Sequence, residues 1–284
     1  MGYNQHQSFY LRDRWLGKGL RAINKDPRFF YQDDAFEKLG LGKNMVQSLR
    51  HWLIATGCAY NDGVGKKRKM ILTPFGNWVL ENDPALKYAD TVAMIHYNIV
   101  YKDEPSSSWF WYFNINNESM SDKENLFIRL DEWVQEKESR VVSKNSIKRD
   151  VDVLLKMYSK GEELEDPEEV ISSPFSRLNL IVEKEEMWKK NEVTMPENSL
   201  LFIKYALCKY SNEKKRYELS VEEILNDSSL IGRVYNMKSS TVLNKLIQLE
   251  NSKIYKINFT RTNNLDYIIL PKITEEELLA QSIY

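Results

Sequence analysis

The sequence predicts a mainly α-helical protein with small β wings, an α+β chain in which winged helix-turn-helix modules at both ends flank a helical middle. Three observations favour this fold. Apolar residues recur every three or four positions through much of the chain, as they do on the buried side of helices. Near each end, helical stretches are followed by two short strands with a polar turn between them. Positive charge is concentrated in the same two regions, since residues 1–80 carry a net charge of +7 and residues 201–272 one of +5, whereas residues 161–200 carry −7.

The N-terminal module is predicted over residues 1–82. Helical spacing from residue 9 to residue 23 ends at Asp26-Pro27, and Asp34 with Glu37 forms a capping box before a short helix at 35–39. A third helix is predicted at 44–56, with Gly57 as its left-handed stop. Segments 58–60 and 70–72 then form a hairpin with a basic tip. This is the order of a winged helix-turn-helix, in which the second helix of the pair enters the major groove.

The polar face of the third helix and the hairpin tip are the predicted DNA contacts of this module. Amide, hydroxyl and guanidinium groups read base edges or bind phosphates, and consecutive cations neutralise phosphates and release counterions. The face carries Lys43, Asn44, Gln47, Ser48, Arg50 and His51, and the tip carries Lys66, Lys67, Arg68 and Lys69. Winged helices also serve as protein-interaction modules with solvated polar faces, so both interpretations remain open at this stage.

Residues 83–160 are predicted to form a helical middle region. Asp90 caps a helix through residue 101, Ser121 and Glu124 form a capping box for a helix to about residue 138, and Ser143 precedes a helix through residue 158. The aromatic run at 109–113 is assigned to the core rather than to base stacking, because large rings bury so much apolar area. Residues 161–198 are predicted to be an acidic connector, and limited proteolysis is expected to cut first at 162–169.

The C-terminal module, predicted over residues 199–284, repeats the element order without repeating the sequence. Ser220 and Glu223 form a capping box for a short helix, a second helix follows at 241–250, and strands at 254–260 and 265–270 form a hairpin. The outward-facing candidates for DNA contact are Lys238, Asn244 and Lys245 on the helix and Arg261 in the hairpin. A module that docks onto the rest of the chain or onto a partner is an equally good interpretation of this pattern.

Composition excludes several classes of protein. The 284 residues include only two cysteines, Cys58 and Cys208, which are too far apart in sequence for a zinc ribbon or a secreted disulfide framework. No signal-peptide pattern is present, and the apolar runs fall far short of the ~18 residues that a membrane span requires. We therefore expect a cytoplasmic protein that does not contact membranes. The net charge of −1 argues against a protein that coats polyanions over its whole surface.

Several phrases of the sequence resemble a bacterial protein family of unknown function, to which the SspB proteins of DNA phosphorothioation systems belong. The most specific is the run Gly-Lys-Asn-Met-Val at 42–46. Where the family tends to carry Tyr-Trp after the arginine of the third helix, this chain has His51-Trp52, which puts one contact in doubt. The matching phrases extend over most of the chain, at residues 9–20, 41–46, 49–52, 55–57, 72–76, 95–97, 109–114, 148–152 and 172–175.

This resemblance implies a role in anti-phage defence, in a system that replaces a backbone phosphate oxygen of DNA by sulfur. The implied partners are DNA, a cysteine desulfurase, an ATPase and a sulfur-insertion enzyme. The resemblance also implies nicking of one DNA strand, which would open the strand for the exchange. A non-enzymatic winged-helix transcriptional regulator and a protein-binding scaffold of the modification complex are the alternatives.

The residues themselves give little support for a nuclease. Metal-assisted cleavage would require Mg²⁺ or Mn²⁺ held by clustered carboxylates. The candidates are Glu132 and Glu136, which share one helix face, and Asp150 with Asp152, whose spacing of two residues does not aim them together on a helix. Charged faces of this kind are usually just solvated. No nucleophile set, phosphate-cradling loop or dinucleotide fingerprint is visible. The catalytic residues and the metal ligands, if there are any, therefore remain unknown from the sequence.

Overall fold

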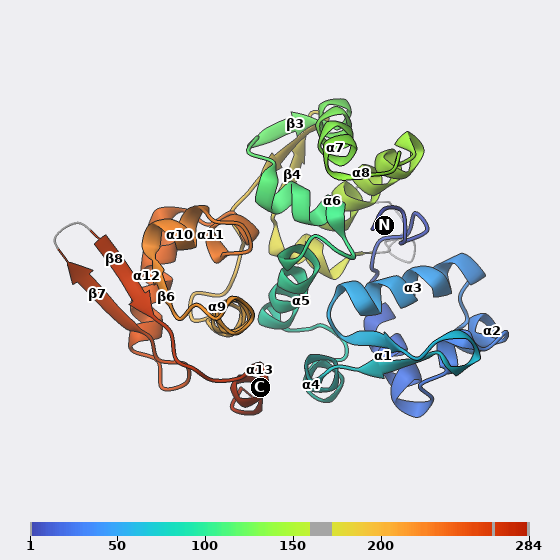
Figure 1. Cartoon of the computed structure of the whole chain (residues 1–284), viewed down its shortest axis with the longest axis horizontal. Helices are drawn as coiled ribbons and strands as arrows, with labels where there is room; N and C mark the ends of the chain where they lie inside the picture. Colours follow the sequence, from blue (N-terminus) through green and yellow to red (C-terminus); the bar gives the residue numbers. More distant parts are fainter. Residues whose placement is uncertain (1, 160–171, 263–264, 283–284) are drawn as a thin grey trace.

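The computed structural model describes residues 2–159, 172–262 and 265–282. In the N-terminal module, helices precede a hairpin and a further helix follows it (Figure 1). The elements are α1 (Trp15–Lys25), the 3-10 helix η1 (Phe29–Tyr31), α2 (Ala35–Leu39), α3 (Lys43–Ala55), β1 (Ala59–Asp62), the 3-10 helix η2 (Gly65–Lys67), β2 (Lys69–Leu72) and α4 (Pro74–Asn82). Helix α3 stops as predicted, because Gly57 takes a left-handed φ of 69° and the amide of Cys58 donates to the Leu53 carbonyl.

Two local predictions for this module are wrong. The first helix starts at Trp15 rather than near residue 9, because the segment before it is held against α3 instead. There the carbonyl of Phe9 accepts a hydrogen bond of 2.9 Å from the indole of Trp52. Asp34 makes no capping hydrogen bond, since its carboxylate pairs with Lys38 Nζ at 2.9 Å. Both errors arise from contacts that apolar spacing and capping patterns do not encode.

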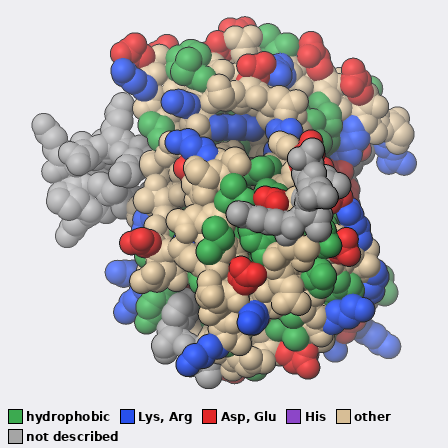
Figure 2. Space-filling model, turned by 90° about the vertical axis from the view of Figure 1, so that its left-hand side faces the viewer, with side chains coloured by type: hydrophobic (Ala, Val, Ile, Leu, Met, Phe, Trp, Pro, Cys, Tyr) green, Lys and Arg blue, Asp and Glu red, His purple; other side chains and the backbone are tan. Residues whose placement is uncertain are grey.

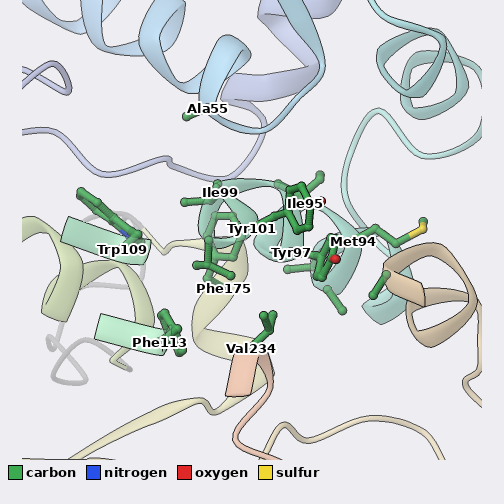
Figure 3. Close-up of a cluster of buried hydrophobic side chains, with 14 of the residues drawn as sticks. Ala55, Met94, Ile95, Tyr97, Ile99, Tyr101, Trp109, Phe113, Phe175 and Val234 are labelled. Carbon is green, nitrogen blue, oxygen red and sulfur yellow. The ribbon is translucent and has the colours of Figure 1, made fainter. Parts of the chain in front are cut away.

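Helix α5 (Ala89–Tyr101) lies at the centre of the molecule, and nearly all of its side chains are buried. Figure 3 shows how residues of α3, α6 (Ser107–Phe110), the π-helical turn η3 (Trp111–Ile115), the 3-10 helix η4 (Pro174–Leu178) and α11 (Ile231–Val234) surround it. The prediction that the aromatic run at 109–113 belongs to the core is confirmed, because Trp109 and Phe113 are each 1% exposed. The core is therefore built from segments far apart in the sequence.

The predicted cap at Asp90 is wrong, and the carboxylate has a different partner. Helix α5 already begins at Ala89, and Asp90 Oδ1 accepts a hydrogen bond of 2.9 Å from the amide of Phe202. Phe202 lies in the first turn of α9 (Leu201–Lys214), so the carboxylate satisfies the start of a different helix. This contact ties the middle region to the C-terminal module.

The middle region also contains a sheet that the sequence did not predict. It combines β3 (Met120–Asp122) with a hairpin of β4 (Ile181–Lys184) and β5 (Met187–Lys190), in the antiparallel order β3-β5-β4. Helices α7 (Lys123–Lys137) and α8 (Lys144–Tyr158) precede the hairpin in the chain. The part of the predicted connector that is described therefore contributes η4 and two strands to the folded body. Segment 162–169, where we expect proteolysis, lies outside the described residues.

The predicted capping box that starts α7 is shifted by one residue. The residue that caps the helix is Asp122, whose Oδ1 accepts a hydrogen bond of 2.8 Å from the amide of Asn125. Ser121 is buried in strand β3, so its hydroxyl does not take the predicted place. The prediction of a helix that reaches about residue 138 is confirmed, since α7 ends at Lys137.

The C-terminal module combines short helices with a three-stranded sheet of order β6-β8-β7. Its elements are α9, β6 (Glu218–Ser220), α10 (Val221–Asn226), α11, α12 (Ser239–Glu250), β7 (Asn258–Thr262), β8 (Leu265–Ile269) and α13 (Glu275–Ala280). The capping box of Ser220 and Glu223 is confirmed. Figure 1 shows α13 next to α4 of the N-terminal module, where the indole of Trp78 donates to the Leu279 carbonyl over 3.1 Å.

Helices with small antiparallel sheets make up the described chain, so the predicted α+β class is confirmed. Both cysteines are buried free thiols, at 0% exposure. Over residues 2–159, 172–262 and 265–282, no helix is both long and apolar enough to pass through a membrane. The N- and C-terminal modules lie at opposite sides of α5 in Figure 1, so each turns a separate face to solvent.

Candidate nucleic-acid interface

The polar face predicted for the third helix is present on α3. Lys43, Asn44 and Gln47 are exposed there, and Arg50 is half-buried. Gln47 is four residues after Lys43, three after Asn44 and three before Arg50, so these side chains line one side of the helix. Amide and guanidinium groups at this spacing are able to donate and accept hydrogen bonds along a groove of DNA.

Two residues predicted for the same face point inward instead. Ser48 is fully buried, and its hydroxyl donates to the carbonyl of Phe9 over 3.1 Å. His51 is 8% exposed and packs edge-on against Trp52 and His6. Burial, with a smaller contribution from His6, lowers the pKa of His51 to about 3, so its ring is neutral at pH 7. The prediction that these two side chains face outward is wrong because the N-terminal segment covers that side of α3.

Arg50 is held in position by contacts with two other elements. Its guanidinium lies 4.9 Å from the ring centre of Tyr31 in η1, a cation–π distance. The hydroxyl of Tyr31 in turn donates to Asn61 Oδ1 in β1 over 2.7 Å. A short chain of contacts thus connects the exposed side of α3 with the hairpin.

A surface hollow of about 400 Å³ lies beside this arrangement. Its lining is rich in amides and comprises Gln5, Gln7, Gln47, Arg50, His51, Ile54, Asn61 and Pro105. Asn, Gln and Arg side chains are those that pair with base edges in two-bond geometries. Gln5 and Gln7 come from the N-terminal segment, and the sequence analysis missed them because no periodic pattern places that segment next to α3.

The tip of the β1–β2 hairpin is basic and exposed. Lys66, Lys67 and Arg68 are exposed there, and within the described chain no carboxylate pairs with them. Lys69 differs, because its Nζ lies 3.2 Å from a carboxylate oxygen of Asp62, directly opposite on β1. We call the exposed side of α3 together with this tip the α3–hairpin surface, which consists of Lys43, Asn44, Gln47, Arg50, Lys66, Lys67, Arg68 and Lys69.

The C-terminal candidates whose side chains the structure describes do not form a comparable surface. Lys238 is exposed with its Nζ 3.9 Å from Glu192, and Asn244 is exposed. Lys245 is 7% exposed, and its Nζ donates to the carbonyls of Glu197 (2.6 Å) and Ser199 (3.0 Å). The prediction that Lys245 faces outward is therefore wrong. Arg261 belongs to β7, and its side chain is outside what the structure describes.

The four carboxylates considered for catalysis are not brought together. Glu132 and Glu136 are exposed on α7, and Asp152 pairs with Lys123. Asp150 is fully buried: its carboxylate bonds to His6 Nε2 at 2.8 Å and to the Ser108 hydroxyl at 2.5 Å. Across the described residues, no three His, Cys, Asp or Glu side chains are placed to hold a metal ion. The predicted set therefore does not fit a divalent cation.

A cationic cluster that the sequence analysis missed joins three elements. Lys190 Nζ donates to the Asn116 carbonyl over 2.5 Å, and burial together with Arg233 and Arg129 lowers its pKa to about 7. Arg233 donates to Asn117 Oδ1 over 2.7 Å. In Figure 2, Lys and Arg side chains gather in the upper part of one face of the molecule. These residues are far apart in the sequence, so only the fold brings them together.

These features define a class: a mixed α+β protein with an exposed polar helix beside a basic hairpin tip. The chain belongs to the family of proteins of unknown function DUF4007, whose profile matches residues 3–283. Two solved structures share the fold. One is a crystal structure of SspB, with a TM-score of 0.88, 21% identity, and coverage of 99% of this chain and 86% of that chain. The other is a magnesium-ion-bound SspB crystal structure, with a TM-score of 0.87, 22% identity and the same coverage. No curated protein matches the chain.

Proposed function

We propose that this protein is a DNA-binding component of a bacterial DNA phosphorothioation system, and that its N-terminal module reads DNA as a winged helix. The observation that carries the proposal is the α3–hairpin surface, where an exposed amide-rich helix face lies beside a basic tip. Three cations of that tip, Lys66, Lys67 and Arg68, have no carboxylate partner among the described residues. The similarity to SspB over 99% of this chain supports the assignment to a phosphorothioation system, and the α3–hairpin surface supports the proposed contact with DNA.

The side chains of this surface suit two different roles, contact with base edges and contact with phosphates. Helix α3 would place Asn44, Gln47 and Arg50 along base edges in the major groove, while Lys66, Lys67 and Arg68 would lie against the phosphate backbone. The contact with Tyr31 holds Arg50 before binding, so less side-chain entropy is lost when it pairs with a base. Lys69 contributes less, because Asp62 already neutralises it.

Salt dependence tests this proposal directly. Replacing Lys66, Lys67, Arg68 and Lys69 by Ala should weaken binding to every duplex and reduce the slope of log K against log salt by up to ~0.9 for each lost phosphate contact. The matched control removes four exposed cations of the same module, Lys18, Arg21, Lys25 and Arg28, and changes the net charge equally. The slope of the control should stay near that of the wild type. Equal losses in both variants, with folding verified by circular dichroism, would exclude the hairpin tip as the contact.

A nicking assay separates the enzyme from its alternatives. SspB has been crystallised with a magnesium ion, so supercoiled plasmid should be incubated with the purified protein and Mg²⁺ or Mn²⁺. Open-circular product would support strand nicking, and its absence under both metals would leave a non-enzymatic winged-helix regulator. Loss of all salt-sensitive DNA binding would instead favour a protein-binding scaffold. A cysteine desulfurase, an ATPase and a sulfur-insertion enzyme encoded next to this protein would support the phosphorothioation role.

A further inference from the structure

A second basic site lies where the segment before α1 meets the residues that lead into η4. It is a cavity of about 650 Å³ lined by Arg12, Asp13, Arg14, Trp15, Ala85, Lys87, Ser172 and Arg177. Two of the phrases singled out in the sequence, residues 9–20 and 172–175, meet at this cavity although some 150 positions separate them. None of its lining residues belongs to the α3–hairpin surface.

The charge of the lining is strongly positive. Four cations face a single carboxylate, that of Asp13. Arg177 Nη2 lies 3.8 Å from Asp13 and donates to the Leu86 carbonyl over 2.7 Å, so Asp13 offsets one cation at most. Arg14 and Lys87 are exposed and have no carboxylate partner in the described part of the chain. An excess of fixed positive charge around a cavity attracts an anion.

Arg12 is held in place by aromatic rings rather than by an acid. Its guanidinium carbon lies 5.6 Å from the ring centre of Phe9, 5.8 Å from that of Tyr10 and 5.1 Å from that of Trp15. Its Nε is buried and has no hydrogen-bond partner among the described residues. A guanidinium fixed in this way presents its donors to a ligand at a small cost in side-chain entropy.

The wall of the cavity is also fixed by main-chain contacts. The amide of Asp13 donates to the Ser172 carbonyl over 3.0 Å, and the Ser172 hydroxyl donates to the Asp13 carboxylate. Arg14 has a left-handed φ of 65°, a conformation that a residue with a side chain rarely adopts in an unconstrained segment. The surrounding fold therefore holds the backbone of Arg14 in this strained conformation and fixes where its side chain leaves the main chain.

We propose that this cavity binds a phosphate group, either of a nucleic-acid backbone or of a free nucleotide. Planar guanidinium groups match phosphate oxygens in two-bond geometries, and a volume of this size accommodates a small ligand. The site goes beyond the proposed DNA contact of the α3–hairpin surface, and the two do not depend on each other.

The test combines two binding measurements on the full chain. The variant carries Arg14→Asn and Lys87→Gln; asparagine tolerates the left-handed backbone, and both side chains are exposed, so folding should be retained. The matched control carries Lys18→Gln and Lys25→Gln on α1, which change the net charge equally outside the cavity. Inorganic phosphate is titrated at constant ionic strength while the thermal midpoint is followed, and a short DNA duplex is titrated over a range of salt concentrations.

The wild type and the control should be stabilised by phosphate, and the variant should bind it about tenfold more weakly, since it loses two charged donors. If the phosphate belongs to DNA, the salt slope of the variant should also fall by up to ~1.8. If only the phosphate response changes, the ligand is a free phosphate compound. Equal responses of variant and control to both probes would overturn the site. The phosphate titration contains no DNA, so its result is independent of the DNA-binding proposal.

Discussion

The N-terminal and C-terminal modules both place helices before a hairpin, but they use the helix that directly precedes the hairpin differently. In the N-terminal module, α3 turns Lys43, Asn44 and Gln47 to solvent. In the C-terminal module, the connector covers part of α12, and the ammonium group of Lys245 donates hydrogen bonds to the main-chain carbonyls of residues 197 and 199. Similar patterns of helix and hairpin thus give one exposed polar face and one that is partly an internal joint.

This difference teaches that helical patterning alone does not define a binding surface. A lysine on the polar side of a helix is free only if no other segment packs over it. The long apolar stem of lysine allows either outcome, because it can lie along apolar surface and bring the charge to a carbonyl or to water. The two modules should therefore respond differently to acid and to substitutions, in stability and in DNA binding.

Acid should destabilise the N-terminal half before the C-terminal module. The chain has three histidines, at positions 6, 51 and 96, so residues 199–284 contain none. Burial lowers the pKa of His51 to about 3 and that of His96 to about 4. Below the ordinary histidine pKa of about 6.5, the unfolded chain therefore binds more protons than the folded chain. The free energy of unfolding should fall by a few kcal/mol as the pH drops from above about 6.5 toward 4.

Amide hydrogen exchange at pH 7 and pH 5 measures this difference segment by segment. Residues near His51 and His96 should lose protection first, and His51→Phe, which keeps a ring but cannot titrate, should reduce the loss. Earlier loss of protection in parts of the C-terminal module away from His96, whose Nε2 contacts the Val234 carbonyl, would rule out buried histidines as the cause. A variant that kept the full pH dependence would rule out His51.

Lys245→Met should lower the free energy of unfolding by about 2–3 kcal/mol, because the part-buried carbonyl of Glu197 and the buried carbonyl of Ser199 lose a charged donor. Burial lowers the pKa of Lys245, as expected for an internal cation. Lys238→Met, at the N-cap of the same helix, is the control, since its side chain is 77% exposed, and it should cost little. Urea denaturation measures both variants. A stable Lys245→Met variant with a smaller salt slope for DNA would place this lysine on DNA instead.

Arg50→Ala should cost about 1–3 kcal/mol in binding free energy on a preferred DNA site and little on other sequences. The corresponding change in the C-terminal module, Asn244→Ala, should affect all duplexes equally and weakly. Fluorescence anisotropy with a panel of duplexes compares the two. Loss of affinity that is the same for every duplex after Arg50→Ala would assign this arginine to the backbone rather than to a base.

Tyr31→Phe should have the smallest effect, about 0.5–1 kcal/mol, because the ring that contacts Arg50 remains and only the hydrogen bond to Asn61 is lost. The loss should appear in discrimination between duplexes, while the salt slope stays that of the wild type. A change in salt slope would mean that the variant has moved the hairpin tip rather than loosened Arg50.

The sequence by itself determined the class of fold, the main helices and the two hairpins. Apolar spacing, the stop at Gly57 and the capping box of Ser220 and Glu223 act between residues close in the chain, so they can be read without a fold. The aromatic run at 109–113 was also predictable, because rings of that size are seldom left in water.

The tertiary structure decided which polar side chains are free. Ser48, His51 and Lys245 fit outward-facing patterns, yet each is covered by a segment distant in sequence. The sheet of β3, β5 and β4 and the cavity at Arg12 likewise depend on pairings across many residues. Local periodicity specifies which side of a helix is polar, whereas long-range packing decides whether that side meets water, another carbonyl or a ligand.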